Sequence, residues 1–438
     1  MASPNQSASP RSRADLERRK LERLRSLLRE ILPHNAFYAA KLARIADPAA
    51  IGSLAELVDW PFTFKEELVA AGTASRPANL TWPPERYVRF HRTSGTRGRP
   101  LAVFDTAADW EWWMACWREI LARGGVGPGD RVLVASSFGP YAGFWSGFDA
   151  AVAAGALAIP TGGMSSVARI EAIRALGVTV LLATPSYALH LAEAAAAEKI
   201  DASALPVRLV IVAGEPGGSM PAVRRRIAAA WGAEVLDHAG ATEVGPWGVG
   251  ERPAASLAVE VLEPFFHAEF LALETGGPAR PGELAELVLT TLGRSGAPVI
   301  RYRTGDVVRP RWPTDAEIAG GCSPAVRLEG GVLGRTDDML VVRGVNVFPG
   351  AVDDILRGFP EVVEYRVTVA TRESLDTMAI EIEDHLAAPD RVADELRLRL
   401  GLRVDVTAVP VGSLPRFEGK GRRFVDRRDP ARRQEPRA

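Results

Sequence analysis

The chain has few of the residues that mark secreted, metal-rich or membrane-spanning proteins. Among 438 residues it has only two cysteines, Cys116 and Cys322, whose wide separation suggests neither a disulfide framework nor a metal cluster. No apolar run approaches the roughly 20 residues that a membrane helix needs. The first 20 residues lack the apolar stretch of a secretory signal. We therefore expect a cytoplasmic protein.

The chain also lacks an excess of charge of either sign. Its 53 basic and 54 acidic side chains give a formal net charge of -1. That balance provides no electrostatic footprint for nucleic acid or an anionic membrane, so we expect neither as a partner. Hydrophobic residues make up 47% of the chain, enough for a large core and, at roughly 150 residues each, about three domains.

Short apolar runs alternate with helix-like stretches in the middle of the chain. The runs RVLVAS (131–136), ALAIPT (156–161), VTVLLAT (178–184) and VRLVIVAGEP (207–216) are typical of strands. Helical patterns at 170–177 and 187–199 lie between them. Strands that alternate with helices predict parallel α/β layers, and continuous apolar runs predict strands covered on both faces.

The ends of the chain differ from this middle part. Residues 1–14 and 428–438 are expected to be disordered tails. From Asp15 a helix is predicted, with leucines at helical spacing and a charged side that we interpret as a solvated face. After Glu283, the runs at 285–292 and 298–308 predict adjacent strands of a smaller barrel-like sheet. The segment after Asp337 predicts a small α+β unit, in which a helix at 391–400 crosses between strands.

A polar, glycine-containing segment, RTSGTRGRP, occupies residues 92–100. Its hydroxyls, glycines and basic side chains can wrap a polyphosphate, although the ending of a Walker loop is missing. A solvent-facing hairpin turn is the alternative. The candidate phosphate-binding residues are Thr93, Ser94, Gly95, Thr96, Arg97 and Gly98.

Two further motifs place carboxylates at strand ends. HAGATEVGPWG at 238–248 follows the strand-like EVLD, and its Glu243 could hold a hard cation such as Mg²⁺. RYRTGD at 301–306 ends on Asp306, which could accept the two hydroxyls of a ribose. Alone, Glu243 could equally be a helix N-terminal acid and Asp306 an exposed turn residue.

Two motifs near the C-terminus complete the set. GRTDDMLVVRGVNVFP occupies 334–349, and LPRFEGKGRR at 414–423 places Lys420 between two glycines. Together with the earlier motifs, and with TPSYALHLAE (184–193) and VAGEPGG (212–218), they resemble the adenylate-forming superfamily and its phenylacetate–CoA ligase branch. The resemblance runs from about residue 90 to 426.

The resemblance implies a reaction in two steps. ATP and a carboxylic acid first give an acyl-adenylate and pyrophosphate, and the acyl group then passes to coenzyme A with release of AMP. We expect a benzoate-like or phenylacetate-like acid. The alternatives are a biosynthetic ligase whose acceptor is a carrier-protein thiol, an amine or a hydroxyl, and a non-catalytic nucleotide-binding homologue. The resemblance also implies a large domain at 15–337 and a mobile C-terminal lid at 338–427, with Asp337 as hinge.

The resemblance further implies roles for individual residues. Lys420 would bridge the carboxylate and the α-phosphate, and Glu243, with Thr242, would serve catalysis and hold Mg²⁺. Asp306 would bind ribose and Arg335 would lie near it. The remaining implied nucleotide-binding residues are Gly214, Glu215, Pro216, Asp237, His238, Ala239 and Gly240.

Two departures from the family pattern are visible. The family usually has an aromatic residue against adenine where this chain has Ala239. Loss of such stacking, worth roughly 1–3 kcal/mol on nucleic acids, predicts ATP binding weaker by one or two decades. Many relatives also carry a Cys/His zinc cluster soon after the Thr-Glu motif. The corresponding segment here has no cysteine, so we expect no structural zinc.

The acyl pocket is expected in the aromatic segment SSFGPYAGFWSGF at 136–148. Its rings could pack against a flat substrate or simply join the core. The candidate pocket residues are Phe138, Tyr141, Phe144, Trp145, Ala213 and Gly240. The tryptophans of DWEWWMACW (109–117) have helical spacing that favours core packing, and a homodimer is left open.

Overall fold

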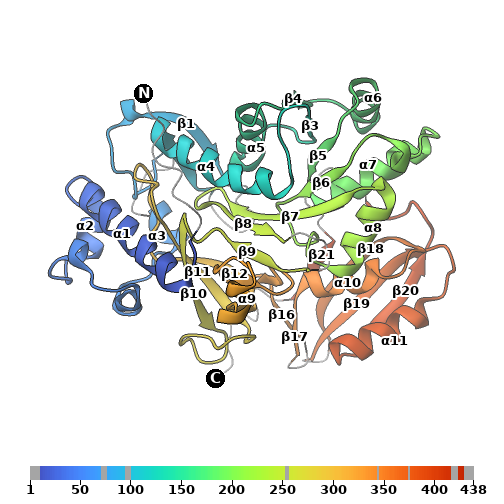
Figure 1. The fold of residues 1–438 in the computed structure, drawn as a ribbon. Coiled ribbons are helices and arrows are strands. Elements are labelled where there is room, and N and C mark those ends of the chain that lie inside the picture. The colour runs from blue at the N-terminus through green and yellow to red at the C-terminus, as the bar shows by residue number, and fades with distance from the viewer. Residues whose placement is uncertain are drawn as a thin grey trace.

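The computed structural model describes residues 10–70, 76–93, 100–251, 256–342, 345–372, 375–415 and 423–428. The chain begins with a layer of helices: α1 (Arg13–Ile31), α2 (Ala36–Lys41) and α3 (Lys65–Ala70). Helix α1 begins where the Ser12 side chain accepts a hydrogen bond from the Asp15 amide, and it buries its leucines as predicted. The helices lie beside the large sheets (Figure 1).

The interpretation of the charged side of α1 as a solvated face was wrong for Lys20. Its side chain is fully buried and its Nζ lies 2.6 Å from Oε1 of Glu263, which is also fully buried. Arg13 contacts the second oxygen of the same carboxylate. Lys20 is thus buried with a carboxylate 243 residues away, and the pair connects α1 to the segment between Val261 and Phe266.

The centre of the molecule is a nine-stranded mixed sheet with the order β13-β14-β9-β8-β7-β6-β5-β3-β4. Strands β4, β3, β5, β6 and β7 pair in parallel, which confirms the predicted α/β layers. The strands are β3 (Arg131–Val134), β4 (Leu157–Pro160), β5 (Val180–Ala183), β6 (Leu209–Val212), β7 (Glu234–Ala241), β8 (Gly245–Gly250), β9 (Val259–Val261), β13 (Pro310–Arg311) and β14 (Arg327–Leu328).

Helices cover both faces of this sheet, so the β5 and β6 strands are buried throughout. Successive residues of a strand point to opposite sides of the sheet: Val210 belongs to one core and Ile211 to the other. One face meets α4 and α5, and its core includes Trp113 and Trp117 as expected for core tryptophans. The covering helices are α4 (Ala107–Arg123), α5 (Ala142–Ala153), α6 (Ser166–Leu176), α7 (Pro185–Ala197) and α8 (Pro221–Trp231).

Two smaller sheets flank the central one. Strands β10 (Phe266–Ala272), β11 (Ala285–Thr291), β12 (Tyr302–Val308) and β15 (Gly334–Arg335) form an antiparallel sheet, which confirms that the segments around 285–308 are adjacent strands. A short helix, α9 (Asp315–Ala319), follows β13. The hairpin of β1 (Tyr87–Arg92) and β2 (Ala102–Thr106) carries residue 93 at its end.

The C-terminal unit has its own core and sheet, order β20-β19-β18-β21. The predicted helix, α11, joins the antiparallel β18–β19 pair to a parallel strand β20. The β16–β17 hairpin and helix α10 were not predicted. The elements are β16 (Leu340–Val342), β17 (Val345–Val347), α10 (Pro349–Arg357), β18 (Val362–Arg372), β19 (Leu375–Asp384), α11 (Pro389–Leu400), β20 (Asp405–Val409) and β21 (Phe424–Asp426).

No helix among the described residues is long and apolar enough to cross a bilayer. The two cysteines, both described, are unpaired: Cys116 is buried and Cys322 is exposed.

Candidate active site

A cavity of about 1780 Å³ lies along the carboxyl ends of the parallel strands and reaches the C-terminal unit. Ligands of open α/β sheets collect at this edge. Typical drug-sized pockets measure about 300–1,000 Å³, so this cavity has room for a nucleotide together with a second molecule. It brings together most of the candidate residues. Those that line it are Thr93, Tyr141, Phe144, Ala213, Gly214, Glu215, Pro216, Asp237, His238, Ala239, Gly240, Thr242, Glu243, Asp306, Arg335 and Asp337.

Some candidates lie outside the described residues, namely Ser94, Gly95, Thr96, Arg97, Gly98 and Lys420. Thr93 and Leu101 lie on either side of the first of these segments and bond to each other. The Thr93 amide donates to the Leu101 carbonyl at 3.0 Å, and the Leu101 amide donates to the Thr93 hydroxyl at 2.9 Å. This reciprocal pair closes the base of the 94–99 segment at the edge of the cavity.

Two of the four aromatic candidates line the cavity and two pack on each other. Tyr141 and Phe144 are lining residues. The Phe138 and Trp145 rings meet edge to face with centroids 5.0 Å apart, and the Trp145 indole donates to the Gly139 carbonyl at 3.1 Å. Neither Phe138 nor Trp145 is among the described residues that line the cavity.

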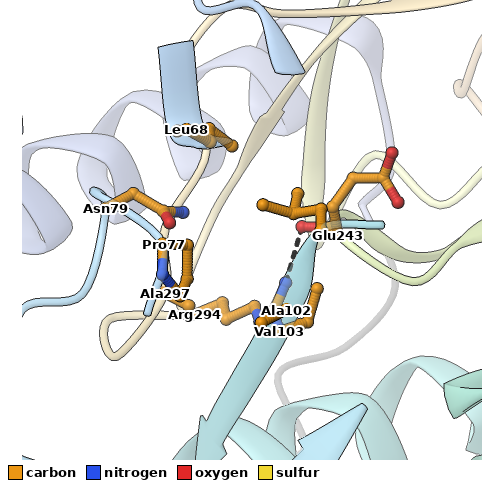
Figure 2. Close-up of a pocket in the computed structure, with 9 residues that line it drawn as sticks. Leu68, Pro77, Asn79, Ala102, Val103, Glu243, Arg294 and Ala297 are labelled. Atoms are coloured by element: carbon orange, nitrogen blue, oxygen red, sulfur yellow. Dashed lines mark hydrogen bonds between the residues drawn. The ribbon is translucent and has the colours of Figure 1, made fainter. Parts of the chain in front are cut away.

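Glu243 lies in the turn between β7 and β8. Its side chain lines the cavity, and its main-chain oxygen accepts a hydrogen bond from Arg294. The Tyr302 hydroxyl donates to Oε1 of Glu243 at 2.9 Å. Arg294 donates to the main-chain oxygen of Glu243 at 2.7 Å, while the carboxylate points away from Arg294 (Figure 2). Burial and the Glu243 charge raise the pKa of Tyr302, so its hydroxyl stays protonated and serves as a donor.

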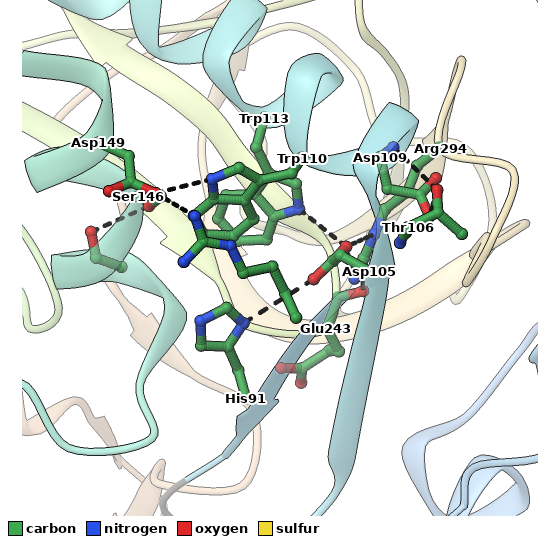
Figure 3. A network of polar contacts seen from close by, with 12 residues as sticks. His91, Asp105, Thr106, Asp109, Trp110, Trp113, Ser146, Asp149, Glu243 and Arg294 are labelled. Atoms are coloured by element: carbon green, nitrogen blue, oxygen red, sulfur yellow. Dashed lines mark hydrogen bonds and ion pairs between the residues drawn. The ribbon is translucent and has the colours of Figure 1, made fainter. Parts of the chain in front are cut away.

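A buried polar network supports Arg294 (Figure 3). Its guanidinium lies 2.7 Å from Oδ1 of Asp105, and both side chains are fully buried. The Trp113 indole donates to Asp105 at 3.3 Å, and the His91 ring nitrogen lies 3.9 Å from it. Burial alone would raise the pKa of Asp105, but Arg294 and His91 outweigh it and hold that pKa below its usual value. Sequence patterns gave no signal for this pair, which lies 189 residues apart.

Asp306 and Arg335 face each other across the β12–β15 pair. Arg335 donates to Asp306 at 3.1 Å and to Asp337 at 2.9 Å. The proposed ribose carboxylate and the proposed hinge residue therefore share one cation. Burial would lower the pKa of Arg335, but the two carboxylates raise it, so the side chain stays charged.

The loops after β6 and β7 form another wall. Gly214 adopts a φ of +93°, a conformation that glycine takes without strain. Burial raises the pKa of Glu215, whose Oε1 accepts the Ser186 amide at 2.7 Å. Burial also raises the pKa of Asp237, although the Ser219 hydroxyl donates to it at 2.5 Å.

Ala239 pairs with Gly248 across the β7–β8 hairpin, so this part of the wall carries little side-chain bulk. The neighbouring His238 packs against Trp117, with ring centroids 4.6 Å apart, and its Nδ1 lies 2.9 Å from the Gly248 carbonyl oxygen. Burial lowers the pKa of His238 to about 4, so the ring is neutral near pH 7.

The C-terminal unit adds cavity residues that sequence reasoning missed. Arg423, directly before β21, lines the cavity and forms an ion pair with Glu364 at 2.6 Å. Tyr365 and Asp353 line it as well, and the Tyr365 hydroxyl lies 2.5 Å from Oδ1 of Asp353. Arg423 is the last residue of the LPRFEGKGRR motif, which gave it no role of its own, and Asp353 and Tyr365 lie outside the motifs singled out above.

Comparison with known proteins agrees with this arrangement. The sequence matches the AMP-binding enzyme family over residues 22–293 and the AMP-binding enzyme C-terminal domain over residues 344–428. It is 30% identical over 429 residues to a phenylacetate–coenzyme A ligase of Pseudomonas putida, which covers 94% of each chain. The chain therefore belongs to the AMP-binding enzyme family. Its similarity along whole phenylacetate–CoA ligases places it in their branch of that family.

Solved structures show the same fold. A 2-hydroxyisobutyryl-CoA ligase in the postadenylation state, in complex with R3-HIB-AMP, is 26% identical and superposes with a TM-score of 0.88, covering 97% of this chain and 94% of that one. The same ligase in its thioesterification state, with 2-HIB-AMP and CoA, gives 0.70 at 98% and 94% coverage. The whole chain thus superposes more closely on the postadenylation state than on the thioesterification state.

Proposed function

We propose that this protein activates an aromatic carboxylic acid, benzoate-like or phenylacetate-like, with ATP and transfers the acyl group to coenzyme A. The carboxylate oxygen attacks the α-phosphate, pyrophosphate leaves, and an acyl-adenylate remains. The CoA thiol then attacks the acyl carbon and AMP leaves. The observation that carries the proposal is the single cavity that joins the nucleotide motifs to the aromatic pair Tyr141 and Phe144.

The proposed roles follow from position and charge. The Thr93 loop, with Ser94 to Gly98, would bind the departing pyrophosphate, and Asp306 would accept the ribose hydroxyls. The loop of Gly214, Glu215 and Pro216 would lie along adenine, opposite the small side chain of Ala239. Lys420 would reach the reacting carboxylate and α-phosphate, where a compact cation stabilises the charge that gathers in the transition state.

Glu243 fits the binding of a magnesium ion together with ATP phosphates. One of its oxygens accepts a hydrogen bond from the Tyr302 hydroxyl, and the carboxylate faces the cavity, as a hard cation held by one carboxylate and substrate phosphates requires. Mg²⁺ would neutralise phosphate charge there. Thr242 stands beside Glu243 on the same wall. We keep the expectation that no structural zinc is needed.

The domain boundary is proposed at Asp337. Leu340, Val342 and Val347 belong to the C-terminal core, so the hairpin that follows Asp337 packs with the C-terminal unit. This supports a large domain at 15–337 and a lid at 338–427 that turns about Asp337 between the half-reactions. We also keep a cytoplasmic location and small-molecule partners as proposals, with a homodimer as a candidate assembly.

The test is a panel of aromatic and aliphatic acids, incubated with ATP and Mg²⁺, with and without CoA. The proposal predicts AMP and an aryl-CoA thioester that depend on both an aromatic acid and CoA. Turnover to a condensed product without CoA would contradict the proposed acceptor. A preference for aliphatic acids would contradict the proposed substrate class.

A further inference from the structure

A buried arginine, Arg169 of α6, lines the cavity away from the nucleotide motifs. Its side chain contacts the segments that follow β3, β4 and β5. It donates to the carbonyls of Ser136 and Thr161 at 3.2 and 3.1 Å and to the hydroxyl of Tyr187. In the sheet order, β6 and β7 carry the proposed nucleotide loops, and β5, β3 and β4 lie on the other side of β6. Arg169 therefore belongs to the acyl half of the cavity.

The charge of Arg169 has no carboxylate partner. The residue is only 6% exposed, yet within the described part of the chain no acidic side chain lies at ion-pair distance from it. Two other buried arginines are paired: Arg294 lies 2.7 Å from Asp105 and Arg301 lies 2.8 Å from Glu269. Buried Arg224 instead donates to the Gly218 and Val235 carbonyls, but it is not among the described residues that line the cavity. Burying a cation against neutral groups alone is unfavourable, so an anionic or strongly accepting group in the cavity would complement Arg169.

Arg169 also keeps a donor available. A guanidinium has five N–H groups, and the described acceptors engage the Nε–H, both Nη2–H groups and one Nη1–H. One Nη1–H remains without an acceptor among the described residues. The same half of the cavity holds Ser136, Ser137, Tyr141 and Phe144. A mostly apolar site with a fixed polar anchor is typical of ligand recognition.

We propose that Arg169 determines substrate specificity by binding an oxygen acceptor of the acid, a hydroxyl or a second carboxylate, at a position remote from the reacting carboxylate. This inference rests on the proposed function and narrows its substrate class to oxygen-substituted acids. The carbonyl and Tyr187 contacts hold the guanidinium in place, so the acid meets a preorganised donor. A charge-assisted hydrogen bond of this kind corresponds to a preference of about tenfold or more in kcat/KM.

The test compares phenylacetate with its 3- and 4-hydroxy and 3- and 4-carboxy derivatives, in acid-dependent pyrophosphate exchange. The wild-type protein should prefer at least one oxygen-substituted acid by about tenfold or more. Arg169→Met should abolish that preference, so that the ratio of kcat/KM for the preferred substituted acid to kcat/KM for phenylacetate falls to about one. The matched control is Arg174→Met, on the same helix but exposed and paired with Glu171, which should keep the wild-type preference.

Three outcomes separate the possibilities. If all five acids support pyrophosphate exchange equally in the wild-type protein, Arg169 recognises no substituent. The inference then fails, while the proposed function stands. An equal loss for every acid in Arg169→Met, with a lower melting temperature, would reduce Arg169 to a structural contact. Absence of exchange with every acid would contradict the proposed function itself. The wild-type comparison can overturn the inference even if the variant does not fold.

Discussion

The hydroxyl of Tyr302 lies 2.9 Å from Oε1 of Glu243 and donates a hydrogen bond to it. The two residues come from different sheets, β12 and the turn after β7, and meet at the cavity wall. Burial and this carboxylate raise the pKa of Tyr302, so its side chain stays a neutral hydroxyl and does not become a second anion beside Glu243. It instead fixes one carboxylate oxygen and leaves the other for a ligand.

Tyr302→Phe should therefore weaken catalysis without unfolding the protein. Loss of a hydrogen bond to a charged group corresponds to roughly 1.5–3 kcal/mol, so kcat/KM for adenylation should fall about tenfold or more. The Mg²⁺ concentration needed for half-maximal pyrophosphate exchange should rise. Tyr87→Phe is the matched control, because that hydroxyl bonds the Gly296 carbonyl away from the cavity. Equal Mg²⁺ requirements in both variants would show that Tyr302 does not position Glu243.

Lys420→Ala should slow adenylation by about a hundredfold or more, as loss of one charge-stabilising group in a transition state typically does. Thioester formation from a supplied acyl-adenylate should suffer much less, because its phosphate has already reacted. Single-turnover measurements of the two half-reactions check this. An equal decrease in the rates of adenylation and thioester formation would contradict the proposed rotation of the lid.

The Arg294–Asp105 pair should stabilise the fold behind Glu243. Arg294→Met leaves Asp105 as a buried, uncompensated charge, which typically costs about 3–5 kcal/mol of unfolding free energy. The double variant Arg294→Met with Asp105→Leu should recover much of that loss, since no isolated charge remains. Urea unfolding of the two variants measures the difference. A double variant no more stable than the single one would indicate that the charge pairing is not the cause.

Glu263 should make the fold sensitive to acid. Burial would raise its pKa, but Lys20 and Arg13 lower it to about 2 from an ordinary value near 4.5. A depressed folded pKa means that this stabilisation is present above about pH 4.5 and is lost as the pH falls toward 2. The difference corresponds to a few kcal/mol. Glu263→Gln should lower stability at pH 7 and flatten the profile between pH 5 and 2, as measured by urea unfolding at each pH. Parallel wild-type and variant profiles would contradict this assignment.

Asp354 should hold the lid in the present arrangement. Its Oδ1 accepts the Ala222 amide of α8 at 2.9 Å, which joins the C-terminal unit to the large domain. Asp354→Ala should slow acyl-adenylate formation several-fold while leaving thioester formation from supplied adenylate unchanged or faster. Both rates can be read in rapid-quench experiments. Slowing of the second step alone would reverse the assigned role.

The parts of the site that could be predicted from sequence are those whose residues stand together in the chain. Glu243 follows β7 of the central sheet, and Asp306 lies within β12 of a neighbouring sheet. Each was singled out by its own short motif, but only the ordered set of motifs favoured a shared site. The partners in the Arg294–Asp105 and Lys20–Glu263 pairs lie 189 and 243 residues apart in the sequence. The spacing of hydrophobic residues predicts local helices and strands, but it does not predict contacts between such distant residues. Phe138 illustrates the opposite limit: its aromatic segment reaches the cavity through Tyr141 and Phe144, while the Phe138 ring packs on Trp145.

The central claim, that the carboxylate itself attacks the α-phosphate, can be tested by isotope transfer. An accepted acid labelled with ¹⁸O in both carboxylate oxygens is incubated with ATP, Mg²⁺ and CoA, and the phosphorus products are analysed by mass spectrometry. Attack by the carboxylate should leave one ¹⁸O in the phosphate of AMP, because the thiol displaces AMP together with the bridging oxygen. Appearance of the label in orthophosphate, or AMP without label, would contradict an acyl-adenylate.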